Sequence, residues 1–81
     1  MQRDEELLRA AFGQVIREAR LGVGESQEEL AHRAGLSRNH LGGIERGEMT
    51  PTIIVLYRLS AALNAGPAEL LERADSKLRP G

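Results

Sequence analysis

Apolar residues recur at intervals of three and four through the first quarter of the chain, the spacing of one face of an α-helix. The positions on this face are Leu7, Leu8, Ala11, Phe12, Val15, Ile16 and Ala19. The run begins near Asp4, and Gly22 and Gly24 follow it. Because glycine is favoured just beyond a helix end, the pattern predicts a helix over about residues 5–21.

A second, shorter helix is predicted over about residues 27–34. Ser26 and Glu29 have the spacing of a capping box, in which each side chain binds the backbone N–H of the other residue. Ala31 offers a small side chain where a crossing helix can approach, and Gly35 tolerates the positive φ of a tight turn. These residues predict the first half of a helix-turn-helix.

The helix after the turn is predicted to be short, about nine residues, and to keep one polar face free. Ser37 can cap it through its hydroxyl, and Gly47 ends it at Arg46. Leu41 and Ile44 lie three residues apart and hold the helix against the core. The free face carries Arg38, Asn39, His40 and Gly43. A polar face that projects after such a turn can enter the major groove of DNA.

The last third of the chain predicts two more helices. Thr52 is expected to cap the first of them, and Asn64, which tolerates left-handed geometry, to end it. Its inward positions are expected to be Ile53, Leu56, Leu59 and Leu63. Pro67 suits the first turn of the last helix, which we expect to end near Ala74. The chain is therefore predicted to be all-α, with five helices and no strand.

The composition allows one small domain, because 81 residues with 41% hydrophobic content can bury a single core. We expect that domain at residues 1–74, with the helix-turn-helix at about 27–46 and a C-terminal tail at 75–81. The chain has no cysteine, which excludes disulfides and thiolate metal sites, and no apolar run approaches the roughly 18 residues of a membrane span. Its charged start, MQRDEELLRA, differs from a signal peptide, so a cytoplasmic location is expected.

The charge balance limits how the protein could bind nucleic acid. The formal net charge is −1, which argues against an indiscriminate polyanion binder, because such affinity comes from clustered Lys and Arg. All of the basic residues except Lys77 are arginine, but they are spread along the whole chain. Any contact with DNA must therefore be local.

Several short runs together carry a resemblance to one family. They are Arg20, the run SQEELAHRAGLS, the run IERG, Pro51 after the loop, and the run ALNAGPAELL. Over about Leu7 to Leu71 the chain resembles the lambda repressor and Cro-type helix-turn-helix regulators, often called the xenobiotic-response-element family. The resemblance implies a compact five-helix domain that binds double-stranded DNA, needs no cofactor, and acts as a repressor or autoregulatory switch. The family includes restriction-modification controller proteins of about this length, which can activate as well as repress.

The resemblance also implies roles for individual residues. In the family, the glutamine that opens the first helix of the motif grips a phosphate, the first two residues of the second helix read bases, and the residue before the closing glycine touches a phosphate. The DNA-binding residues expected here are Gln27, Ser37, Arg38, Asn39, His40, Gly43 and Arg46. The residue types suit this, because Arg can donate to guanine O6 and N7, and Asn can bond adenine N6 and N7.

Each assignment has an alternative. Arg38 and Asn39 could be ordinary exposed polar residues, and Gln27 could serve only as a helix-start residue. His40 could bind a phosphate, read a base weakly, or lie on the helix surface. A lone histidine without cysteine or a paired histidine is rarely a metal site, so no metal is expected.

Arg20 and Glu45 are expected to form an ion pair, because the family buries this carboxylate against an arginine of the first helix. Its role would be to orient the recognition helix, since desolvation consumes much of the Coulomb gain. The alternative is a catalytic pair of acids. No second carboxylate, nucleophile or ligand cluster shares the expected face, so an enzyme is not predicted.

Four residues depart from the family pattern. Many relatives carry a base-contacting side chain at Gly42–Gly43, and here a bare backbone could approach the groove wall or a thymine methyl, or could reflect tolerated surface drift. Glu25 replaces an apolar residue, and Glu48 places negative charge where relatives often have Lys or Arg. We therefore expect modest DNA affinity that falls steeply with salt.

A second apolar stripe on the predicted fourth helix, continued in the fifth, predicts an interface. Its members are Ile54, Tyr57, Ala61, Leu70 and Leu71. A stripe of this size is more often an interface than idle surface, so we expect a homodimer that presents two recognition helices to the half-sites of a palindrome. The main alternative is an antitoxin-type module that neutralises a partner protein and binds DNA for autoregulation.

Overall fold

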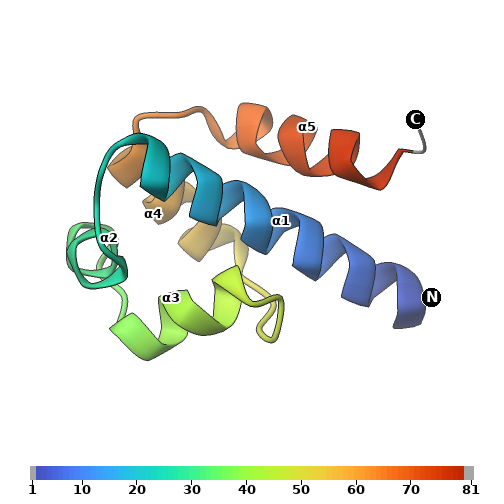
Figure 1. The fold of residues 1–81 in the computed structure, drawn as a ribbon, viewed down its shortest axis with the longest axis horizontal. Helices are drawn as coiled ribbons and strands as arrows, with labels where there is room; N and C mark the ends of the chain where they lie inside the picture. The colour runs from blue at the N-terminus through green and yellow to red at the C-terminus, as the bar shows by residue number, and fades with distance from the viewer. Residues whose placement is uncertain (1, 80–81) are drawn as a thin grey trace.

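The computed structural model describes residues 2–79, and within them it contains five helices and no strand (Figure 1). They are α1 (Gln2–Gly22), α2 (Gln27–Ala34), α3 (Arg38–Glu45), α4 (Ile53–Leu63) and α5 (Pro67–Leu78). The predicted all-α fold is therefore confirmed, and the bounds of α2 are as predicted. No helix in residues 2–79 combines the length and the hydropathy needed to cross a membrane.

α1 is the central element of the fold. In Figure 1, α5 runs antiparallel to α1 on one side of it, and α3 lies on the other. The largest fully buried side chains come from all five helices and are Val15, Ile16, Leu30, Leu41, Ile44, Leu59 and Leu70. The apolar face of α1 starts later than predicted, because Leu7 and Leu8 are about half exposed.

The capping box at the start of α2 is present as predicted. The Ser26 hydroxyl accepts a hydrogen bond from the Glu29 backbone N–H at 3.1 Å, and the Glu29 carboxylate accepts one from the Ser26 N–H at 2.8 Å. The bond from the Ser26 backbone holds the pKa of Glu29 below its ordinary value. At the other end of α2, Gly35 has a φ of 70°, which alanine would adopt only with strain.

Two predicted helix details are wrong. Ile53 does not face the core: it is the first residue of α4 and is 69% exposed. The last helix was expected to end near Ala74, but α5 continues through residues 75–78. Lys77 forms an ion pair with Glu18 of α1 at 3.0 Å, which helps to fix this extension. Residues 80 and 81 of the expected tail lie outside the described residues.

Candidate nucleic-acid interface

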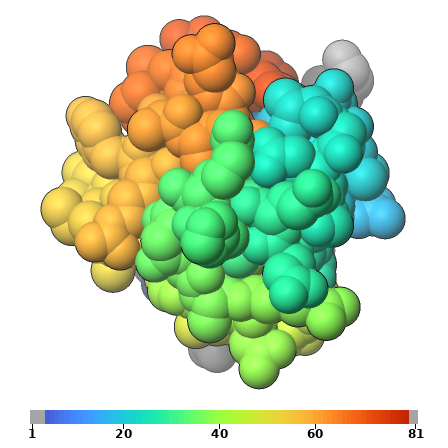
Figure 2. Space-filling view, turned by 90° about the vertical axis from the view of Figure 1, so that its left-hand side faces the viewer, coloured from blue at the N-terminus to red at the C-terminus, as the bar shows by residue number. Residues whose placement is uncertain are grey.

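The start of α3 forms an exposed polar edge of the molecule. Arg38 and Asn39 are exposed, and His40 is half-buried. Ser37 is exposed as well, and its hydroxyl accepts a hydrogen bond from the His40 backbone N–H at 3.0 Å, which caps the helix. In the view of Figure 2, α3 lies along the lower edge of the surface, with α2 above it. Its polar residues are thus accessible to a large ligand.

The opposite side of α3 is packed against the core. Leu41 is fully buried and Ile44 is 1% exposed, as the three-residue spacing predicted. Eight residues are too few for a helix to be stable alone in water, so this burial holds α3 in place. The polar edge therefore has a fixed orientation relative to the rest of the domain.

Gly13 of α1 sets how closely α1 and α3 approach. A Cβ atom at this buried position would lie 2.7 Å from the Glu45 carbonyl oxygen and still closer to the carbonyl oxygen of Ile44. No side chain larger than hydrogen fits unless the backbones separate. Sequence reasoning missed this residue, although a glycine in the middle of a long apolar helix face marks a possible close contact.

The expected ion pair between Arg20 and Glu45 is present and ties α3 to α1. Arg20 Nε lies 2.8 Å from Glu45 Oε2, and Arg20 Nη2 lies 3.0 Å from Glu45 Oε1. Arg20 Nη1 also donates to the backbone carbonyl of Glu25 at 2.9 Å. The hydrogen bond with Glu45 raises the pKa of Arg20 above its ordinary value, while burial opposes that shift.

Gln27 joins this cluster from the first position of α2. Its side-chain Nε2 donates to Glu45 Oε1 at 3.0 Å, and the residue is half-buried. Gln27 thereby links α2 to α3 and fixes the position of its own amide. Only one of the two amide hydrogens is needed for this bond, so the other remains able to donate to a phosphate.

Arg46 follows α3 and is paired with an acidic neighbour. Its Nε lies 3.1 Å from Glu48 Oε1, and both side chains are about 60% exposed. Glu48, which departs from the family pattern, therefore pairs with Arg46. The carboxylate offsets the positive charge at the position where a phosphate contact is expected.

Gly43 follows Asn39 along the same face of α3, but it is covered rather than free, so the prediction that it contributes to the free polar face is wrong. The residue is buried in the structure, and a Cβ at this position would lie 2.6 Å from Met49 Sδ and 2.9 Å from Met49 Cγ. The Met49 side chain comes from the loop after α3 and covers the glycine. The bare backbone at Gly43 therefore cannot approach a groove directly.

The predicted interface stripe is mostly exposed. Ile54 is 60% exposed, Tyr57 59% and Leu71 47%, and Ala61 is exposed as well. Leu70 is the exception: it is fully buried within its own chain, so assigning it to an interface was wrong. Leu71, the next residue on the helix, points about 100° away from Leu70 and is 47% exposed.

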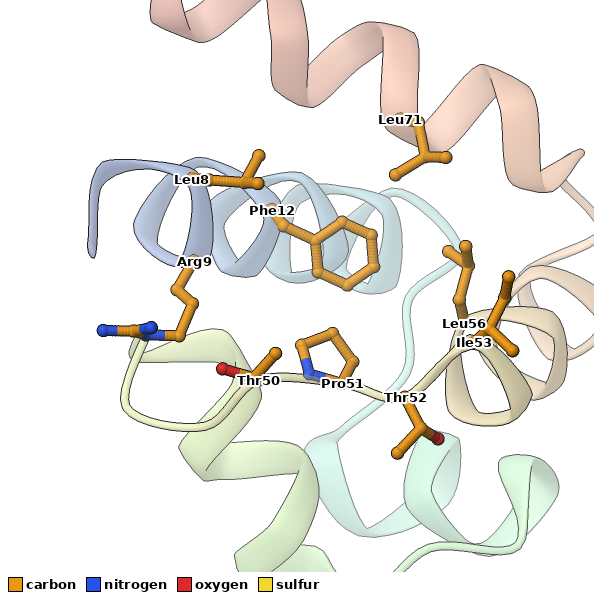
Figure 3. A pocket seen from close by; sticks show the side chains of 9 residues that line it. All are labelled: Leu8, Arg9, Phe12, Thr50, Pro51, Thr52, Ile53, Leu56 and Leu71. Atoms are coloured by element: carbon orange, nitrogen blue, oxygen red, sulfur yellow. The ribbon is translucent and has the colours of Figure 1, made fainter. Parts of the chain in front are cut away.

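An apolar cavity of about 280 Å³ adjoins this stripe (Figure 3). It lies between α1, α5 and the loop that leads into α4. Its apolar lining residues are Leu8, Phe12, Pro51, Ile53, Leu56 and Leu71. Sequence reasoning missed the cavity, because the residues that form it are far apart in the chain.

Comparisons with known proteins agree with this geometry. A family model described as helix-turn-helix matches residues 16–70. The chain is 37% identical over 68 residues to the uncharacterized HTH-type transcriptional regulator y4dJ of Sinorhizobium fredii, covering 84% of this chain and 88% of that protein. It is 36% identical over 66 residues to control protein C.BamHI of Bacillus amyloliquefaciens, covering 80% and 82%. The crystal structure of the restriction-modification controller protein C.AhdI from Aeromonas hydrophila matches with a TM-score of 0.75 and 42% identity, covering 76% and 94%.

The matched family and relatives are DNA-binding regulators rather than enzymes, and this chain shares their fold. The chain belongs to the helix-turn-helix family, and its resemblance to Cro-type regulators and controller proteins is confirmed. Among the described residues, no group of three or more His, Asp or Glu could hold a metal ion.

Proposed function

We propose that this protein regulates transcription by placing α3 of each subunit of a homodimer in the major groove of a palindromic operator. One observation carries the proposal: Arg38 and Asn39 are exposed at the start of a helix whose other side is buried by Leu41 and Ile44. A helix seated in this way presents its first turn to base edges. The length and relatives of the chain favour a compact repressor or controller.

Within this proposal, Arg38 and Asn39 read bases, because their side chains can form two bonds with guanine and adenine respectively. Gln27 and Arg46 bind phosphates on either side of α3. Ser37 and His40, next to the first turn of α3, contact the DNA backbone. Backbone contacts of this kind fix the register of the helix but carry no sequence information.

Substituting Arg38 and Arg46 separately distinguishes base reading from phosphate binding. Arg38→Ala is expected to abolish the sequence preference at one base pair of each half-site. The free energy of binding to the preferred operator should fall by about 1–3 kcal/mol. Arg46→Ala is expected to weaken binding to all DNA sequences alike. The slope of log binding constant against log salt concentration should become shallower by about 1. Selection of bound sequences from random DNA, followed by titrations at several salt concentrations, measures both effects.

The wild-type protein is the control in the same selection. If the wild-type protein recovers all sequences equally, operator recognition is excluded and the protein-interaction alternative is favoured. If Arg38→Ala recovers the wild-type operator unchanged, Arg38 does not read a base.

Glu48 is expected to attenuate DNA binding through its ion pair with Arg46. Glu48→Gln should raise affinity about threefold for every sequence, since an exposed pair of this kind contributes no more than about 1 kcal/mol. Titrations of one operator at low and moderate salt measure the change. Glu28→Gln, which removes an exposed charge from α2, is the control. Weaker binding by Glu48→Gln would show that the carboxylate supports the DNA-bound geometry instead.

The homodimer is supported by the exposed apolar residues of α4 and α5. Ile54, Tyr57 and Leu71 are each about half exposed or more. Leu71 also lines the apolar cavity of Figure 3, together with Ile53 and Leu56 of α4. Contiguous apolar surface of this kind is costly to leave in water and is typical of an interface. A two-fold axis there would pair the α3 helices of two subunits.

Tyr57→Glu is expected to convert the protein to a monomer, because it would bury an unpaired charge at the proposed interface. Sedimentation at micromolar concentration measures the mass, with Leu21→Glu as the control on another exposed apolar residue, 53% exposed at the end of α1. A wild-type protein that sediments only as a monomer, with or without operator DNA, would contradict the dimer.

A further inference from the structure

Met49 occupies the notch that Gly43 leaves in the surface of α3. The backbone N–H groups of Glu48 and Met49 both donate to the Gly43 carbonyl oxygen, at 2.9 and 3.3 Å. The loop therefore folds back onto the helix and lays the Met49 side chain over Gly43. No side chain at position 43 competes for this place.

The notch lies in line with residues that face the proposed groove. Gly43 is four residues after Asn39 and three before Arg46, so these positions follow one another along the same helix face. Met49 is 41% exposed even though it covers Gly43. Its thioether thus adds an accessible apolar group to a face on which Asn39 and Arg46 are polar.

We propose, on the basis of the operator binding proposed above, that Met49 is a specificity-determining residue that contacts the C5-methyl group of a thymine in each half-site. A thioether donates no hydrogen bond and is only a weak acceptor, so it suits an apolar feature of the groove. The thymine methyl is the apolar group that the major groove presents, and it distinguishes thymine from the other bases. The side chain that reads this base comes from the loop, while the helix contributes the glycine that seats it.

The test removes the methyl group from the DNA and the thioether from the protein. The operator selected by the wild-type protein is prepared with each thymine in turn replaced by deoxyuridine, which lacks only the C5-methyl. Binding of each duplex is measured for the wild type, Met49→Ala, Met49→Leu and the control Leu21→Ala. Each protein is compared with itself on the two duplexes, so a variant with a smaller folded fraction gives the same ratio.

The wild type and Leu21→Ala are expected to lose about fourfold in affinity at one thymine of each half-site, the effect of one buried methyl group. Met49→Ala should bind the thymine and uridine duplexes equally. Met49→Leu should keep most of the difference, because an aliphatic side chain of similar volume still covers the methyl.

Equal thymine-to-uridine ratios in the wild type and Met49→Ala would overturn the assignment and leave Met49 as a cover for Gly43 alone. If the wild type selects an operator and Arg38→Ala changes it, that result leaves the proposed function intact. If the wild type selects no operator, the proposed function fails and the role of Met49 fails with it.

Discussion

Gly13→Ala is expected to lower the free energy of unfolding by about 2–3 kcal/mol, near the upper end of what an overpacked methyl group costs. The new Cβ would lie 2.7 Å from the Glu45 carbonyl oxygen and closer still to that of Ile44. Both obstacles are backbone atoms of α3, which cannot rotate away as a side chain can. The loss should appear although alanine favours helix formation over glycine by about 1 kcal/mol.

Urea unfolding followed by circular dichroism measures this change. Gly22→Ala is the matched control, because Gly22 also belongs to α1 and a Cβ there would meet no atom within 4 Å. The control should leave stability unchanged or raise it by up to about 1 kcal/mol. A Gly13→Ala protein as stable as the wild type would show that α1 and α3 can separate without cost.

Arg20→Met is expected to lower the free energy of unfolding by about 3–5 kcal/mol, because it leaves a buried carboxylate without its cation. The Glu45 side chain is only 2% exposed, so water cannot replace the guanidinium. Gln27 still donates one hydrogen bond to Glu45, but it carries no charge. Urea unfolding at neutral pH measures the loss.

Two further variants separate the charge from the packing. Arg73→Met removes a partly exposed arginine that lies 3.9 Å from Glu18, and it should cost no more than about 1 kcal/mol of unfolding free energy. Arg20→Met combined with Glu45→Leu should recover much of the lost stability, because apolar pairs often replace buried ion pairs without cost. An Arg20→Met protein no less stable than Arg73→Met would mean that the buried pair does not hold α3.

The start and end of most helices could be predicted because local chemistry determines them. Ser26 and Glu29 bond each other's backbone, Gly35 has the positive φ that its position requires, and Asn64 has a φ of 54° at the end of α4. Each of these features depends on residues within about four positions of one another. The bounds of α2 and the turn of the motif were therefore accessible from sequence.

The remaining errors concern contacts between segments that are distant in the chain or between faces that a pattern cannot distinguish. Near the end of α5, Lys77 pairs with Glu18 of α1, and no local signal marks a pair between residues so far apart in the chain. Gly43 was assigned to the free face because the loop that places Met49 over it could not be predicted. The sequence identified an apolar stripe that includes Leu70, but it did not show which side of α5 faces the core.

The short length of α3 bears on the thermodynamics of binding. Eight residues hold helical form here because the core and the Arg20–Glu45 pair impose it, so the segment is already ordered in the free protein. Docking such a preformed element incurs no folding entropy, unlike the capture of a disordered arm. Calorimetry of complex formation should accordingly show a modest heat-capacity change, proportional to the surface area buried in the interface and without a contribution from folding.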